Sequence, residues 1–317
     1  MRLTVATWNL YLGADLALLL DATTLEELAD RIDVVRGQLQ RTDFTERARA
    51  IAGLLQREQV DVAGLQEVSR WTEAPLSDLE HPTVLADFLP VVLAELAHLG
   101  TPYDVHAVRG SFEGGLPVGD RWMQVAGSNV VLVRRDAGLE VVAEETGHFA
   151  TTLELRTGIE GVAFPVRRSW GRVDLVAGGR RLGVVNTHTE AYDAGVRDAQ
   201  RDELLAQVEA RVEAQVDRVV AVVLLGDLNA TPEQVGVGTP YVDAWTAAGG
   251  DPDGGRTCGQ SGDLSNPAPD LRERIDYVFV RDLAVRSCRV VGGDPQDRTP
   301  SGLWPSDHAA VVAELEL

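Results

Sequence analysis

Asp227 and Asn229 are the residues of this sequence whose types and spacing first suggest chemistry. They occur in the stretch LGDLNATP (225–232), directly after the apolar run VVAVVL (219–224). Residues i and i+2 of an extended segment point to the same face, so the two side chains can serve one site. A carboxylate beside an amide suits a hydrated cation or a phosphate. The alternative is that these residues only end the strand, as turn residues do.

The same layout, an apolar strand with polar residues at its end, occurs in four further segments. They are ATWNL with Asn9, GLQEV with Glu67, VVNTHTE with Asn186 and His188, and WPSDHAAV with Asp307 and His308. Each polar residue, taken singly, could be an ordinary strand end, a cap or a structural histidine. Together they predict an oxygen-rich site for a hard cation, with a histidine base beside it and no soft ligand.

A sixth segment, RIDYVFV, places Asp276 inside an otherwise apolar strand. Burying an ionised carboxylate without a partner costs several kcal/mol, so Asp276 is expected to have one. A histidine is a natural partner, because an Asp–His pair fixes the imidazole tautomer and raises its basicity.

The ordered set WN, QE, NTH, GDLN, IDY and SDH resembles the endonuclease/exonuclease/phosphatase family of deoxyribonuclease-like, metal-dependent phosphoesterases. The resemblance runs from Thr7 to the final strand, and GDLN and SDH are its most specific pieces. It implies an α/β (α+β) four-layer sandwich, in which two mixed β-sheets pack face to face with helices on both outer faces. The polar strand ends would meet at one rim of the sandwich.

The resemblance also implies roles for the residues that match the family's motifs. Asn9 and Glu67, with Asp307 close enough to assist, would hold a divalent ion, Mg²⁺ or its substitute Mn²⁺. Asp227 would orient or deprotonate the attacking water. Asn229 and His188 would bind the phosphate, and His308, held by Asp276, would act as general base or as a second phosphate donor. Whether Asp227 or His308 takes the proton stays open.

Three residues are weaker candidates for substrate binding. Arg168, in the stretch RSWGR, is a potential phosphate ligand, although a surface arginine on an edge strand is an equal alternative. Asn129 lies on a strand that borders the site in the resembling family. Asn186 precedes His188 by two residues on the same expected strand.

The leading functional hypothesis is therefore a hydrolase of phosphoester bonds on a small-molecule or lipid-derived substrate. The alternatives are an endonuclease or exonuclease acting on DNA, including abasic or single-stranded DNA, and a non-catalytic binding module on the same fold. The formal net charge of −20 disfavours nucleic acid, because a globally acidic protein repels a long polyanion unless a basic patch or metal compensates.

Alternating and helical hydrophobic patterns predict the elements that position these residues. The main expected helices are 24–39, 45–56, 83–99 and 196–216. The expected strands are 3–10, 60–68, 104–109, 123–134, 140–143, 162–168, 172–176, 182–188, 219–225, 275–280, 283–291 and 308–315. Two long loops are expected at 251–269 and 292–305, and no sequence repeat is found.

The 317 residues are interpreted as one catalytic domain, 1–317, with an insertion near 14–43 that could be a lid, a partner surface or a plain insertion. No apolar run is long enough to cross a bilayer. We expect a cytoplasmic location, or a secreted one if a presequence has been removed. Cys258 and Cys288 could form one disulfide, but two free thiols are favoured. Nothing in the sequence indicates an oligomeric state.

Overall fold

The structure, a computed structural model, describes residues 1–214 and 221–317 of the chain. Within these residues, two mixed sheets and a separate two-stranded hairpin account for the strands. The first sheet has the order β14-β15-β1-β2-β5-β4, with β3 paired to β2, and the second has the order β12-β13-β11-β10-β9-β6. The hairpin consists of β7 (Leu153–Arg156) and β8 (Ala163–Val166).

The strands of the first sheet are β1 (Arg2–Asn9), β2 (Val62–Pro75), β3 (Thr83–Asp87), β4 (Tyr103–Val118), β5 (Arg121–Arg134), β14 (Ala284–Val291) and β15 (Ala310–Glu316). Those of the second sheet are β6 (Leu139–His148), β9 (Ser169–Ala177), β10 (Arg180–His188), β11 (Ala221–Asp227), β12 (Val242–Asp243) and β13 (Asp276–Arg281). The helices are α1 (Leu25–Arg41), α2 (Phe44–Arg57), α3 (Phe88–His98), α4 (Ala194–Glu213), α5 (Ala244–Ala247) and the short 3₁₀ turns η1 (Leu16–Leu19) and η2 (Pro295–Asp297).

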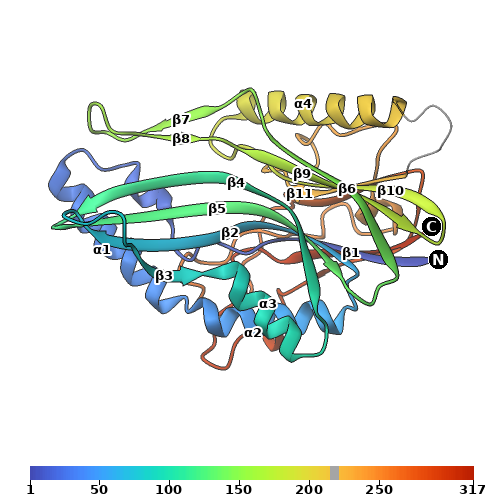
Figure 1. The fold of residues 1–317 in the computed structure, drawn as a ribbon, viewed down its shortest axis with the longest axis horizontal. Coiled ribbons are helices and arrows are strands. Elements are labelled where there is room, and N and C mark those ends of the chain that lie inside the picture. Colours follow the sequence, from blue (N-terminus) through green and yellow to red (C-terminus); the bar gives the residue numbers. More distant parts are fainter. Residues whose placement is uncertain (215–220) are drawn as a thin grey trace.

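Four layers follow one another in Figure 1: α4, the second sheet, the first sheet, and the helices α1 to α3. Three apolar clusters hold them together. Residues such as Val5, Val184 and Val223 fill the space between the sheets, Ile51 belongs to the cluster beneath α1 to α3, and Leu204 to the cluster beneath α4. The sandwich of two mixed sheets with helices on both outer faces is thus confirmed.

Most elements that carry the predicted site residues agree with the sequence expectations. However, β2 continues beyond the expected end at 68 to Pro75, so Glu67 lies inside a strand, and Arg168 lies between β8 and β9. The predicted N-terminal cap of α1 is also present, because Thr24 Oγ1 accepts the backbone N–H of Glu27 at 3.1 Å. The end of the expected helix 196–216 and the start of the expected strand 219–225 lie outside the described residues. Of the helices that are described, none is both long and apolar enough to cross a membrane.

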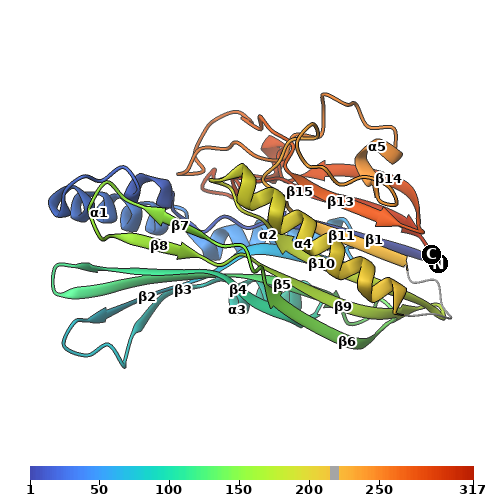
Figure 2. The same cartoon turned by 90° about the horizontal axis from the view of Figure 1, so that it is seen from above.

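Two further expectations are corrected. The segment 83–99 is not one helix, because residues 83–87 form β3, whose backbone pairs with β2 before α3 begins at Phe88. The strand expected at 104–109 is also longer than predicted, since β4 continues to Val118 and pairs with β5 along its whole length. Together β4 and β5 form the long ribbon that extends beyond the sandwich in Figure 2.

Candidate active site

Parallel strand pairs at the centre of both sheets bring the predicted residues to one rim. β1 runs parallel to β2, with Asn9 opposite Gln66, and β10 runs parallel to β11, with His188 opposite Asp227. β13 is antiparallel to β11 and places Asp276 opposite Asp227. Sites in α/β proteins form beyond the carboxyl ends of parallel strands, and both parallel pairs end at this rim.

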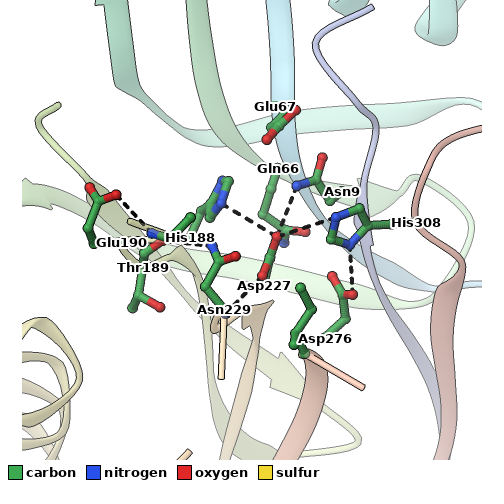
Figure 3. A network of polar contacts seen from close by, with 12 residues as sticks. Asn9, Gln66, Glu67, His188, Thr189, Glu190, Asp227, Asn229, Asp276 and His308 are labelled. Atoms are coloured by element: carbon green, nitrogen blue, oxygen red, sulfur yellow. Dashed lines mark hydrogen bonds and ion pairs between the residues drawn. The ribbon is translucent and has the colours of Figure 1, made fainter. Parts of the chain in front are cut away.

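Asp227 is the centre of the polar network drawn in Figure 3. Its Oδ2 accepts a hydrogen bond from Nδ2 of Asn9 at 3.0 Å. The same oxygen lies 3.5 Å from Nε2 of His188 and 3.8 Å from Nε2 of His308. Its Oδ1 accepts the backbone N–H of Asn229 at 3.0 Å. Residues from the ends of β1 and β10 and from the segment before β15 therefore converge on one carboxyl group at the end of β11.

The environment of Asp227 changes its acidity. The residue is only 1% exposed. Burial, reinforced by the negative charge of Asp276, raises the pKa of Asp227 to about 7, against the opposing effect of His308. A carboxyl group with this pKa can take up or release a proton near neutral pH.

Asp276 and His308 form the Asp–His pair that the sequence suggests. Nδ1 of His308 lies 2.8 Å from Oδ2 of Asp276, and both residues are buried. Burial works to lower the pKa of His308, but the Asp276 carboxylate, with Cys258 and Asp307, outweighs it and holds this pKa well above 6.5. The pair therefore favours a protonated imidazole whose Nε2 faces Asp227.

His188 has the opposite character. Burial lowers its pKa well below 6.5, and the charges of Arg168 and His308 lower it further. Nη1 of Arg168 lies 3.2 Å from both ring nitrogens of His188, and Nε of Arg168 lies 3.5 Å from Oε2 of Glu190. Arg168 is buried and faces the site, so it is not a surface arginine on an edge strand.

Glu190 was missed by the sequence reasoning. It is fully buried, and its Oε1 accepts the backbone N–H groups of Ala191 and Tyr192 at 2.8 and 3.0 Å. The available signal was its position two residues after His188, which is the same spacing that singled out Asp227 and Asn229. Glu190 supplies the negative charge that balances Arg168 beneath the site.

Glu67 is directed into the site by an irregular backbone. Its φ of +54° is unusual for a residue with a side chain, and the pairing of β2 with β5 shifts register between Leu65 and Val68. Such bulges re-aim side chains and are common beside active sites. Oε2 of Glu67 accepts the backbone N–H of Leu12 at 2.8 Å. Among the described residues, no cationic group forms an ion pair with Glu67.

The remaining predicted metal ligands lie next to Glu67. Burial, with the nearby charge of Glu67, raises the pKa of Asp307 to about 6, although His308 and Arg47 oppose the shift. Oδ1 of Asn9 accepts the backbone N–H of Tyr11 at 2.9 Å. Two neighbouring carboxylates that repel each other, with an amide oxygen close by, form a donor set that fits a hard divalent cation.

A second group of donors could also hold an ion. Ligand atoms of Asp227, Asp276 and His308 lie within 4.8 Å of one another, and all three residues are buried. Nδ1 of His308 is occupied by Asp276, so Nε2 is the imidazole atom left for a ligand. Oδ1 of Asp276 is buried and has no hydrogen-bond partner in the described part of the chain.

The predicted asparagines separate into two groups. Asn229 lines the site, and its Nδ2 donates one hydrogen to the carbonyl of Thr189 at 3.0 Å, which leaves the second hydrogen for a ligand. Asn186 and Asn129 instead join the two sheets: Asn186 donates to the carbonyls of Leu65 and Val130, each at 3.0 Å, and Asn129 donates to that of Ser169 at 2.8 Å. Neither of these two lines the cavity.

Arg47 is a further residue that the sequence reasoning did not single out. It lies on α2, is 0% exposed, and donates hydrogen bonds to the carbonyls of Thr42, Leu10, Pro305 and Tyr11 at 2.7 to 3.3 Å. Leu10 follows Asn9, and Pro305 precedes the Ser-Asp-His stretch. Arg47 thus fixes the backbone on both sides of the predicted metal ligands.

One cavity of about 190 Å³ contains the catalytic candidates. Its lining at this end includes Asn9, Glu67, Arg168, His188, Asp227, Asn229 and His308. Residues 6–308 match the sequence pattern of the Endonuclease/Exonuclease/phosphatase family. The chain belongs to that family. Its members are phosphoester hydrolases that generally depend on divalent metal ions, which assigns the chain broadly to metal-dependent phosphoesterases.

Solved structures of endonuclease/exonuclease/phosphatase proteins share this fold. Truncated TDP2 from Caenorhabditis elegans is 20% identical with a TM-score of 0.61, over 100% of this chain and 98% of that one. A mannosyl-6-phosphatase from Bacteroides thetaiotaomicron is 18% identical with a TM-score of 0.61, over 99% and 100%. D. rerio TDP2 complexed with a single-strand DNA product is 16% identical with a TM-score of 0.59, over 100% and 99%. No curated protein matches the chain.

Proposed function

We propose that this chain is a Mg²⁺-dependent phosphoesterase that hydrolyses a small-molecule or lipid-derived phosphoester, with Mn²⁺ as a possible substitute. The observation that carries the proposal is the convergence of Asn9, His188 and His308 on the Asp227 carboxyl group, inside a cavity that Glu67 also lines. Glu67, Asn9 and Asp307 would hold the metal, which when bound supplies Lewis acidity and lowers the pKa of a water molecule.

In the proposed reaction, the oxygen of a water molecule forms a bond to phosphorus while the opposite P–O ester bond breaks. Asp227 orients this water and takes its proton, because its pKa near 7 suits proton transfer at neutral pH. The alternative proton acceptor is His308, but Asp276 holds its ring in place and favours its protonated form, so His308 serves as a further donor to the phosphate. The leaving oxygen takes up a proton from solvent, so the products are an alcohol and a phosphate with one ester bond fewer: a monoester from a diester, or inorganic phosphate from a monoester.

The donors around Asp227 would stabilise the phosphoryl oxygens as negative charge develops. His188 is neutral at pH 7 and can donate one N–H, while Arg168 beside it carries a fixed positive charge. Asn229 has one amide hydrogen free of Thr189. Preorganised donors of this kind are each worth about 3–4 kcal/mol of transition-state stabilisation.

The test is a phosphoester screen with Mg²⁺, containing phosphomonoesters, phosphodiesters and DNA oligonucleotides with and without abasic sites. We expect turnover of small phosphoesters by the wild type. Asp227→Asn, which keeps the shape of the side chain, should lose at least about 100-fold in kcat. A cooperative thermal unfolding transition should show that the variant is still folded. Turnover only of DNA would replace the proposal with the nuclease alternative. Substrate binding without any turnover would favour a binding module.

A further inference from the structure

The cavity that contains Asp227 continues into a second, apolar arm. Its lining changes from the polar residues above to Phe112 and Leu116 of β4, Met123 and Val125 of β5, and Leu16 of η1. Ser111 and Leu116, which are five residues apart along β4, both line the cavity. At the rise of a β-strand this spans roughly 17 Å, so the arm is long compared with a phosphate group.

Besides β4 and β5, two segments that the resembling motifs do not include form walls of the arm. One is the predicted insertion, residues 14–43, which contributes Leu19 and Leu20 near η1, and Ile32 from α1. The other is the β7–β8 hairpin, which contributes Leu155 and Phe164. In Figure 2 the hairpin runs beside the β4–β5 ribbon toward α1.

The hairpin and the insertion are packed against each other. Gly158, in the turn of the hairpin, approaches the insertion so closely that a Cβ there would lie 2.8 Å from the carbonyl oxygen of Ala22. Ile159 and Val162 of the same turn pack on the apolar cluster that contains Leu28 and Ile32. The arm is therefore a built cavity with walls on several sides, and not an incidental gap between loops.

The polar groups available in the arm exclude a polyanionic or strongly hydrated occupant. Among the described residues that line the whole cavity, Arg168 is the only arginine, and it lies at the polar end. Two polar side chains of the arm are already engaged: Ser111 Oγ donates to the carbonyl of Gly127, and Gln124 Nε2 donates to Glu113. A nucleic acid strand would need cations along its path, and a sugar would need free hydrogen-bonding groups.

From these observations we propose that the apolar arm binds an unbranched alkyl chain that is esterified to the phosphate held at Asp227. This inference rests on the proposed phosphoesterase function and names its substrate class as alkyl phosphoesters. The elongated shape of the arm favours a linear chain over a compact ring. The insertion and the β7–β8 hairpin are thereby assigned to substrate selection.

The first experiment measures binding without chemistry. Methyl, butyl, octyl and dodecyl phosphonates, whose P–C bond is not an ester, are titrated by calorimetry into the Mg²⁺-loaded protein. We expect Kd to fall by up to about fourfold for each added methylene, until the chain exceeds the arm. A phenyl phosphonate that binds as tightly as the octyl compound, or a naphthyl phosphonate that binds as tightly as the dodecyl compound, would overturn the assignment to a linear chain.

The second experiment follows turnover of methyl alkyl phosphodiesters with the same four chains by ³¹P NMR. Phe164→Asp should reduce the octyl-to-methyl ratio of kcat/KM at least about tenfold, because a carboxylate replaces an apolar wall. The matched control is Val142→Asp on β6, which is 40% exposed and does not line the cavity, and should leave the ratio unchanged. Leu155→Asp replaces Phe164→Asp if the latter does not fold.

The outcomes separate the two proposals. Turnover with no dependence of Kd or kcat/KM on chain length overturns the alkyl-binding arm but leaves the phosphoesterase function intact. Chain-length-dependent binding without turnover of any ester contradicts the phosphoesterase function and supports the arm. If kcat/KM is higher for a single-stranded oligonucleotide than for the octyl diester, the proposal that the arm selects the substrate is also overturned.

Discussion

Replacing Arg47 by methionine is expected to weaken both the fold and the proposed metal site. The substitution removes four hydrogen bonds to backbone carbonyls and leaves those oxygens buried. At about 1–1.5 kcal/mol for each bond, the loss is about 4–6 kcal/mol. Within the described residues Arg47 forms no ion pair, so removing its buried charge offsets part of this loss. We expect a net decrease of about 3 kcal/mol in the free energy of unfolding.

The assay is urea unfolding followed by tryptophan fluorescence, with Arg49→Met as the matched control on the same helix. Arg49 is 63% exposed at its side chain and pairs with Glu95 at 3.3 Å, so its loss should cost less than about 0.5 kcal/mol. The Mg²⁺ concentration for half-maximal activity should also rise in Arg47→Met, because the Leu10 and Pro305 carbonyls flank the proposed ligands. Equal unfolding midpoints for the two variants would refute this account of Arg47.

Four further predictions concern the active site. Glu67→Ala should raise the Mg²⁺ requirement and lower the maximal rate, and wild-type rates across Mg²⁺ and Mn²⁺ titrations would contradict the metal assignment. EDTA should abolish activity, with recovery on adding Mg²⁺ or Mn²⁺ but not Ca²⁺ alone; robust turnover in EDTA would contradict it. In EDTA, the melting temperature of Asp227→Asn should rise relative to that of the wild type as pH increases from about 4 to about 7. Folding raises the pKa of Asp227 from 3.8 to about 7, so the charged carboxylate destabilises the folded wild type over that range. A difference in melting temperature that is constant with pH would argue against that shift. Asp276→Asn should lower the pKa of His308, because the Asp276 carboxylate raises this pKa against the effect of burial. The measurement is an NMR titration of the His308 ring protons, and an unchanged pKa would show that the two residues are not coupled.

The catalytic candidates could be predicted because polar residues in or beside apolar strands recur in six segments, although each residue alone has an ordinary structural explanation. The expected pairing of Asp276 with His308 and the cluster around Asp227 are found at hydrogen-bonding distances. Their individual roles remain proposals. The sequence could not reveal which way Asn129 and Asn186 point, because both faces of their strands are buried and polarity then does not mark the site face.

Other features escaped prediction because they depend on contacts distant in sequence. The bulge that re-aims Glu67 arises from pairing with β5, about sixty residues away, and leaves no local signature. The β7–β8 hairpin has two strands of only four residues each, and the hydrophobic pattern predicts a strand only at 162–168. Residues 83–87 fit the apolar pattern of the helix that follows them, yet they extend because β2 offers an edge to pair with.

The strand β1 lies between β2, about fifty residues further along the chain, and β15, about three hundred residues further along. During synthesis one edge of β1 therefore stays unpaired until β15 has left the ribosome. His308 and Asp307, just before β15, arrive at the same late moment. A nascent chain that lacks this segment has no Asp–His pair, so we expect activity only after β15 has been synthesised and has paired with β1.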